Sequence, residues 1–284
     1  MKIFVTGGTG FIGGHFLKKL SQSSHRGAAL RRAGSRPRVA LEQEPTWLEG
    51  NLDNDWMNEL SQCRVLVHFA AVGVNLQNAD WDEVFYANLY QSLHLWRQAV
   101  AAGVKRLILC GCGWEHGSAA DRFPFLSPDT ALEPTTPYGA SKAAATMAAL
   151  ALAIETKIEL LVLRPFEIYG EGQPENCFWP SLRKAAQAGE NFAMSAGEQI
   201  RDFTPVEKVA DIFLGSLMRT DLRPGHPVIE NIGTGNPQPL RVFAEAQWTL
   251  MGAKGRLKIG ARSYHADEVM RSVPFLPKER PQWI

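Results

Sequence analysis

Short runs of hydrophobic residues alternate with segments of helical spacing over residues 1–165. Most of the runs are rich in Val, Ile and Leu, and they lie at 2–6, 28–30, 65–70, 106–110 and 159–164. Continuous apolar runs of this length are typical of strands that are buried on both faces of a parallel sheet. The alternation with helical segments predicts crossover connections. We therefore expect an α/β fold built on a parallel sheet.

Two long helices are predicted between these strands. Apolar residues recur at steps of three and four over 80–102, which is the period of an amphipathic helix. An alanine-rich segment over 138–155 predicts a second helix. Beyond residue 164 the pattern loosens, with Gly, Pro and aromatic residues at 170–180, helices near 180–188 and 240–251, and a strand at 228–233. We interpret this part as a smaller lobe over the edge of the sheet.

The amino-acid composition limits the kinds of partner that the protein is expected to bind. The 284 residues include 30 Lys and Arg against 29 Asp and Glu, so no overall field favours nucleic acid or an anionic membrane. The start, MKIFVTGGTG, turns polar after one short strand, unlike a signal peptide, and no later apolar run is long enough to span a bilayer. We expect a cytoplasmic protein whose four cysteines are reduced.

The strongest local signal is TGGTGFIGG at 6–14, between the first strand and the first predicted helix. Gly8, Gly10 and Gly13 match G-x-G-x-x-G, and Gly7, Gly10 and Gly13 match G-x-x-G-x-x-G. Glycines let the backbone approach a pyrophosphate, which the N–H groups and dipole of the helix N-terminus then attract. The position after a strand and before a helix indicates a dinucleotide site rather than a structural turn.

The residues after the second strand suggest which dinucleotide binds. An NAD site has an acid about 20 residues past the glycines, but no Asp or Glu precedes Glu42. The segment holds Arg31, Arg32 and Arg36 instead, whose guanidinium groups suit a 2′-phosphate. We therefore expect NADP(H) rather than NAD(H). A solvated basic loop is the alternative.

Tyr138 and Lys142 stand four residues apart at a predicted helix start, so they share one face. An ammonium group at this spacing is expected to lower the pKa of the phenol from about 10 toward neutrality. A phenol tuned in this way donates a proton to a carbonyl under reduction or accepts one from an alcohol under oxidation.

With these motifs the chain resembles the extended short-chain dehydrogenase/reductase family of sugar-nucleotide epimerases, dehydratases and ketoreductases. The similarity extends over TGGTGFIG, HFAA at 68–71, PYGASK at 137–142, LRPFEIYGEGQ at 163–173, RDFTPVEKVAD at 201–211 and NIGTG at 231–235. The resemblance implies a Rossmann-type doubly wound parallel sheet with a smaller C-terminal substrate-binding lobe. Residues 1–165 would form the NAD(P)-binding domain, and 166–284 would form mainly the lobe, with some chain returning to the Rossmann core.

The resemblance also implies roles for individual residues. Tyr138 and Lys142 would be catalytic, Arg201 and Asn176 would bind the diphosphate of a nucleotide-diphosphate sugar, and the helices around Asn88 and Tyr138 would pair in a homodimer. The cofactor would contact Gly7, Gly10, Phe11, Ile12, Gly13, Arg31, Arg32, Leu52, Ala70, Ala71, Asn88, Tyr138, Lys142 and Pro165.

The stretch CGCGWEHG at 110–117 departs from the family pattern. In the family a Ser or Thr stands five residues before the last glycine and donates a hydrogen bond to the reacting oxygen, and here that position is Cys112. Metal and redox readings compete, but a Cys-x-Cys pair without a matching pair is a poor zinc site, and we expect no metal. Since a thiol donates weakly, Thr135, Thr136 and Ser118 are alternative donors.

The same stretch separates reaction types. The family's 4,6-dehydratases carry Asp-Glu where this chain has Gly113 and Trp114, and its epimerases hold NAD tightly, which the missing ribose acid disfavours. The leading hypothesis is therefore NADPH-dependent reduction of the 4-keto group of a nucleotide-linked 4-keto-6-deoxyhexose. The alternatives are an NAD-dependent sugar-nucleotide 4-epimerase and a catalytically weakened dinucleotide-binding regulatory protein.

Overall fold

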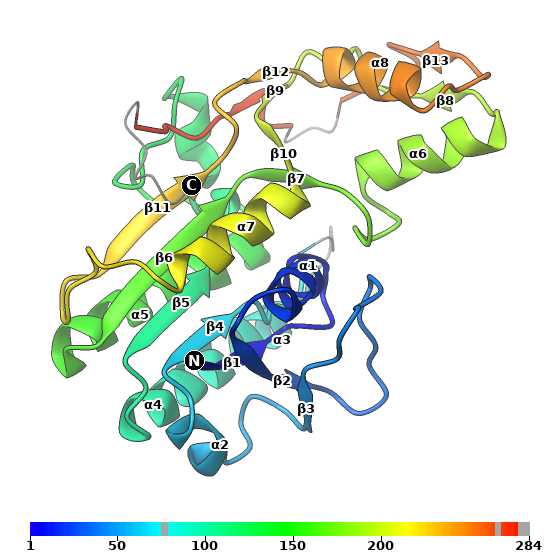
Figure 1. Ribbon diagram of the computed structural model, residues 1–284. Coiled ribbons are helices and arrows are strands. Elements are labelled where there is room, and N and C mark those ends of the chain that lie inside the picture. Colours follow the sequence, from blue (N-terminus) through cyan, green and yellow to red (C-terminus); the bar gives the residue numbers. More distant parts are fainter. Residues whose placement is uncertain (75–78, 265–267, 278–284) are drawn as a thin grey trace.

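A seven-stranded, wholly parallel sheet forms the centre of the computed structural model, which describes residues 1–74, 79–264 and 268–277 (Figure 1). Its order is β11-β6-β5-β4-β1-β2-β3. The strands are β1 (Lys2–Thr6), β2 (Arg26–Arg31), β3 (Thr46–Glu49), β4 (Val65–His68), β5 (Arg106–Cys110), β6 (Glu159–Pro165) and β11 (Val228–Ile232). The order reverses between β1 and β4, and ligands of such sheets bind beyond the carboxyl ends of the strands at this switch point.

All six predicted strands are confirmed, and β3 is an addition. The predicted run at 28–30 is part of the longer β2, and the strand expected at 228–233 is β11. The sequence analysis missed β3 because its four residues, TWLE, are exposed or only partly buried and lie at the sheet edge.

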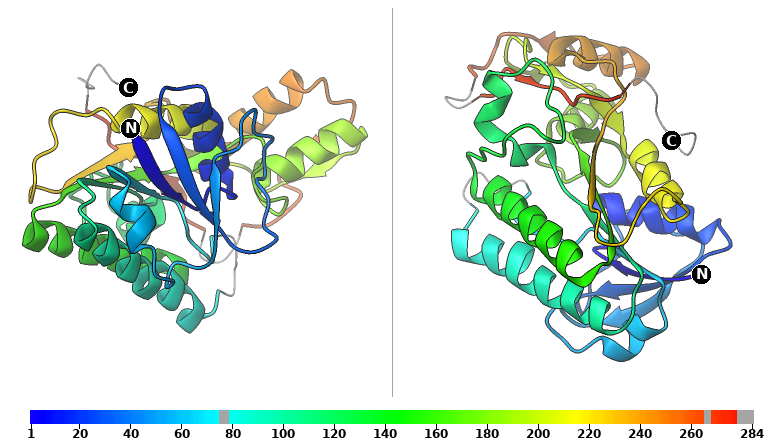
Figure 2. Two further views of the ribbon diagram at one scale, coloured as in Figure 1. Left: turned by 60° about the horizontal axis from the view of Figure 1, so that its bottom comes forward. Right: turned by 90° about the vertical axis from the view of Figure 1, so that its left-hand side faces the viewer.

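Helices cover both faces of the sheet, as Figure 2 shows. One face carries α1 (Phe11–Ser21) and α7 (Val206–Ser216), and the other carries α2 (Met57–Ser61), α3 (Trp81–Phe85), α4 (Ser92–Ala101) and α5 (Pro137–Thr156). Successive residues of a strand face the two helix layers in turn. In β1, Phe4 packs with α4 and α5, whereas Ile3 and Val5 pack with α1 and α7. This explains why the strands are apolar throughout rather than alternating.

The helix predicted over 80–102 is interrupted by a π-helical segment, η1 (Tyr86–Gln91). Within it lies Asn88, which is buried and accepts a hydrogen bond from the Val72 N–H at 2.8 Å. Its amide nitrogen donates to Val72 O at 3.0 Å and to Ser141 Oγ at 2.9 Å. The irregular turn thus connects the loop after β4 to α5, and such π segments frequently occur at functional sites.

A smaller lobe lies above the carboxyl ends of the strands (Figure 1). Its helices are α6 (Phe178–Ala188) and α8 (Leu240–Leu250), which pack around Leu182, Met194 and Trp248. Small sheets complete it: β7 (Glu167–Tyr169) with β10 (Phe203–Pro205), β9 (Ile200–Arg201) with β12 (Gln238–Pro239) and β14 (Arg271–Ser272), and β8 (Phe192–Ala193) with β13 (Leu257–Lys258). Between these segments the chain returns to the sheet through α7, which the sequence analysis did not identify, and through β11.

None of the helices in the described ranges is long and apolar enough to cross a bilayer.

Candidate active site

The glycine loop between β1 and α1 leaves no room for side chains. Gly7 has φ +69°, and a Cβ there would lie 2.6 Å from the Ala70 nitrogen. A Cβ on Gly13 would lie 2.2 Å from Gly7 O, the same oxygen that accepts a hydrogen bond from Gly10 N at 2.9 Å. The first turn of α1 contains no acidic residue. A bare loop before a positive helix end fits the pyrophosphate of a dinucleotide.

A cleft of about 700 Å³ extends from this loop to the smaller lobe. Twelve of the residues predicted for the site line it: Gly7, Gly10, Phe11, Ile12, Gly13, Ala71, Cys112, Tyr138, Lys142, Pro165, Asn176 and Arg201. The glycine loop, the Tyr-Lys pair and the expected substrate residues therefore share one cavity, although they come from distant parts of the chain.

Five predicted cofactor residues do not line the cleft: Arg31, Arg32, Leu52, Ala70 and Asn88. Asn88 is buried with the hydrogen bonds described above, so its amide holds the site's framework instead of facing the cavity. Leu52 packs against the hydrophobic core, and the Ala70 N–H donates to Thr6 Oγ1 at 3.4 Å.

The basic segment after β2 is arranged differently from the expectation. Arg31 donates to Glu49 Oε1 from Nε (3.2 Å) and Nη2 (2.8 Å), and its guanidinium lies 5.1 Å from the centroid of the Trp47 ring. Arg32 is exposed. The arginine of this segment that lines the cleft is Arg38, which the sequence analysis overlooked although it belongs to the same basic run.

The start of α5 brings the predicted catalytic groups together. Thr136 caps the helix by accepting a hydrogen bond from Gly139 N at 3.1 Å, which sets Tyr138 and Lys142 one turn apart. The Lys142 ammonium donates to Cys110 O at 2.7 Å. Cys112 lies close enough to Tyr138 to raise the pKa of the phenol. The residue that replaces the family's Ser or Thr is thus a neighbour of the phenol.

The other candidate donors do not reach this position. Thr136 serves as the helix cap, Ser118 Oγ donates to Glu133 Oε2 at 3.1 Å, and Thr135 is exposed and does not line the cleft.

The expectation that Lys142 lowers the pKa of Tyr138 is wrong for this structure. Burial raises the pKa of Tyr138 well above its ordinary value, and the neighbouring Cys112, Cys110 and Glu115 act in the same direction. Burial likewise raises the pKa of Cys112 to about 12 and that of Cys110 to about 11. At neutral pH the phenol and both thiols are therefore protonated, and Tyr138 is in the form that donates a proton.

Behind the catalytic groups lies a buried ion pair that the sequence analysis also missed. The Glu115 carboxylate and the Arg164 guanidinium are 0% and 1% exposed, and Arg164 Nε lies 2.9 Å from Glu115 Oε2. Thr146 Oγ1 of α5 donates to Oε2 at 2.9 Å, and the Cys112 N–H donates to Oε1 at 2.8 Å. Glu115 thus connects the Cys112 loop to α5 and to β6. The sequence did contain a signal for this pair, because Glu115 is an acidic residue within the mainly apolar stretch that follows β5.

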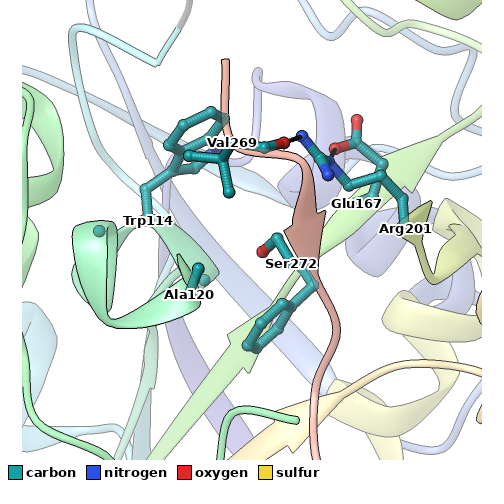
Figure 3. A pocket seen from close by; sticks show the side chains of 9 residues that line it. Trp114, Ala120, Glu167, Arg201, Val269 and Ser272 are labelled. Carbon is teal, nitrogen blue, oxygen red and sulfur yellow. Dashed lines mark hydrogen bonds and ion pairs between the residues drawn. The ribbon is translucent and has the colours of Figure 1, made fainter. Parts of the chain in front are cut away.

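The far part of the cleft contains a charged cluster, and Figure 3 shows two of its members, Glu167 and Arg201. Arg201 lines the cleft as predicted, but its guanidinium lies 3.9 Å from Glu167 and 3.4 Å from Glu268. Burial lowers the pKa of Arg201 and raises that of Glu167. Asn176 lines the cleft just before α6, whose first turn contains no acidic residue.

Nothing in the geometry favours a metal or redox centre at the paired cysteines. Cys110 and Cys112 are both free thiols. In residues 1–74, 79–264 and 268–277, no three His, Cys, Asp or Glu side chains are grouped so that they could hold a metal ion.

A glycine loop facing a Tyr-Lys pair across one cleft defines an oxidoreductase site that uses a dinucleotide, and comparisons with known proteins agree. The model of the NAD dependent epimerase/dehydratase family matches residues 3–233. The chain therefore belongs to this family and is an enzyme of the extended short-chain dehydrogenase/reductase type.

Individual relatives and solved structures are similar over most of the chain. A probable UDP-glucuronate 4-epimerase of Rhizobium meliloti is 26% identical over 90% of this chain and 83% of the relative. A dTDP-D-glucose 4,6-dehydratase of Mus musculus is 27% identical over 82% of this chain and 68% of the relative. The structure of MoeE5 in complex with UDP-glucuronic acid and NAD aligns with a TM-score of 0.81 and 27% identity, covering 97% of this chain and 90% of that one.

The contact between Tyr138 and Cys112 predicts unequal effects of substitution. Tyr138→Phe removes the proton donor, so we expect turnover to fall by roughly 10²–10⁴-fold with cofactor affinity little changed. Cys112→Ser substitutes a stronger donor and is expected to retain or raise turnover. Steady-state kinetics together with cofactor titration checks both. Loss of turnover in Cys112→Ser with full activity in Tyr138→Phe would make the thiol the working group.

The buried ion pair predicts a large stability effect. Glu115→Gln keeps an acceptor for the Cys112 N–H but leaves the Arg164 guanidinium buried without its counter-charge, which costs about 3–5 kcal/mol. Urea unfolding measures the loss. Glu133→Gln is the matched control, because it removes the charge from the more exposed Arg122–Glu133 pair, which solvent screens, and it should change the stability far less. Equal losses in the two variants would contradict the role given to Glu115.

Proposed function

We propose that the protein is a nucleotide-sugar 4-epimerase that uses a nicotinamide dinucleotide to move hydride reversibly at C4 of the sugar. The observation that carries the proposal is the position of Tyr138, with Cys112 and Lys142 beside it, in the cleft that begins at the glycine loop. Membership of the family supports it, as do relatives whose names describe 4-epimerases acting on UDP-linked sugars.

The chain's own residues would handle the proton. A bound nicotinamide supplies hydride transfer. When a C4 carbonyl is reduced, the Tyr138 hydroxyl donates its proton to the oxygen, and the raised pKa keeps that proton in place until it is needed. When a C4 alcohol is oxidised, the phenolate accepts the proton, and since burial disfavours the phenolate, the Lys142 ammonium one turn along α5 would have to offset that cost. The two steps cancel in an epimerisation, so no net oxidation occurs.

The nucleotide would enter from the lobe side of the cleft. Asn176 stands at the start of α6, where backbone N–H groups and the helix dipole favour phosphate and no acid in the first turn opposes it. Arg201 is less suited to a diphosphate than the sequence suggested, since Glu167 and Glu268 already neutralise it.

The second candidate is NADPH-dependent reduction of a nucleotide-linked 4-keto-6-deoxyhexose. In this reaction Tyr138 would give its proton to the C4 oxygen while NADPH would supply the hydride, and the products would be the alcohol and NADP⁺. The basic segment favours it: no acid precedes Glu42, Arg32 is exposed, and Arg38 lines the cleft, which would suit a 2′-phosphate. Solved neighbours in complex with NAD favour the epimerase instead.

The bound cofactor and the redox balance distinguish the two candidates. For the epimerase we expect heat-released NAD(H) in stoichiometric amount, and NMR-detected interconversion of C4 epimers of a UDP-sugar without added cofactor. Tyr138→Phe, as control, should release the same cofactor without interconversion. Consumption of NADPH by a nucleotide-linked 4-keto sugar, without epimerisation, would select the reductase. Cofactor binding with neither activity would leave the regulatory alternative.

We also propose a homodimer formed through α3, η1 and α5. Trp81, Tyr86, Tyr90, Met147 and Ile154 are each more than half exposed on these adjoining helices. We expect sedimentation velocity to give the mass of two chains and Met147→Glu to shift it toward one. Met218→Glu, at an exposed methionine elsewhere, is the control and should leave the dimer intact. A monomeric unmodified protein would refute the proposal.

A further inference from the structure

The part of the cleft around Arg201 contains more negative than positive charge. The cluster of Glu167, Arg201 and Glu268 has two carboxylates around one guanidinium, and all three residues line the cavity. Glu167 is the more accessible of the paired groups, with its side chain 38% exposed against 10% for Arg201. A ligand in the cleft therefore meets a carboxylate before it meets the cation.

The Arg201 guanidinium has few N–H groups left that could bind a ligand. Nε faces Glu167, Nη1 donates to Ile200 O at 3.0 Å, and Nη2 reaches both Glu268 and the Val269 carbonyl oxygen. Figure 3 shows the side chain held between Glu167 and the segment that contains Val269. Both terminal nitrogens of Arg201 thus already have acceptors, and Nε lies at ion-pair distance from Glu167. Recruiting it for an anionic substituent would break contacts that neutralise a buried charge.

Contacts between residues of the cleft lining connect the Glu167–Arg201–Glu268 cluster to the predicted catalytic groups. Cys112, a neighbour of Tyr138, is followed by Gly113, where a Cβ would lie 2.9 Å from the Phe166 ring. Glu167 follows Phe166 at the start of β7. Trp114, Glu167 and Arg201 line both the main cleft and a small adjoining pocket (Figure 3). A sugar that reacts at Tyr138 therefore has Glu167 as a neighbour.

We propose that Glu167 determines which sugars the enzyme accepts, by excluding those that carry a carboxylate. The inference rests on the proposed action on nucleotide-linked sugars and deepens it. A uronic acid would place a second negative charge beside Glu167 in a cavity of low dielectric, where like charges repel strongly. Hydroxyl groups, in contrast, donate hydrogen bonds to a carboxylate. The substrate class is thus neutral hexoses or pentoses rather than uronic acids.

The experiment compares UDP-glucose with UDP-glucuronic acid at pH 8, far above the ordinary range of a carboxyl group, because burial raises the pKa of Glu167. We expect kcat/KM to favour UDP-glucose by roughly 100-fold or more. Glu167→Gln keeps the shape and removes the charge, so the preference should fall by about tenfold or more, mainly through a gain for the uronic acid. Glu171→Gln, an exposed acid that does not line the cleft, is the control and should leave the ratio unchanged.

Binding measurements keep this test separate from the proposed function. Calorimetry on the cofactor-loaded protein gives Kd for both nucleotide sugars without turnover. If neither sugar reacts, the proposed function fails, while the Kd ratio still decides the role of Glu167. Equal affinity and turnover of the two sugars in the unmodified protein, or the same ratio in Glu167→Gln, would overturn the inference.

Discussion

The position of the predicted catalytic groups depends on one fully buried carboxylate, that of Glu115. It accepts hydrogen bonds from the Cys112 backbone, from Thr146 on α5 and from Arg164 on β6. These three segments bring the thiol, the phenol-bearing helix and the adjacent strand into one arrangement. Arg164 in turn donates to Pro128 O, which extends the network beneath the cleft. Because a buried charge without its partner is costly, the pair permits few alternative arrangements of these segments.

The same burial sets the protonation of the site. A low-dielectric environment disfavours phenolate and thiolate, so Tyr138, Cys110 and Cys112 all keep their protons at neutral pH. The nearby Glu115 charge adds to the effect. The Cys112 thiol therefore lies beside Tyr138 in its protonated form, at the position where the family pattern has Ser or Thr.

The two parts of the cleft differ in how far family membership explains them. The glycine loop and the Tyr-Lys pair follow the family pattern closely, because pyrophosphate binding and proton transfer each permit few backbone geometries. The part under the smaller lobe differs from the expectation, since Arg201 is paired with two carboxylates. Differences in substrate among members with the same fold arise in such regions, because the sheet's stability does not depend on them.

The sequence alone determined the features that arise from local spacing. Strand runs, the glycine loop, the Tyr138–Lys142 pair and both long helices each depend on residues within one segment, so periodicity and capping predict them. Only the tertiary structure decided which charges meet. Glu115 pairs with Arg164, which lies 49 residues further along the chain, and Arg201 pairs with Glu268, which lies 67 residues further. Arg31 pairs with Glu49, which lies on a strand that the pattern did not predict. Such partners, and the burial that raises the pKa of Tyr138, depend on how crossovers and the smaller lobe pack, which no local pattern encodes.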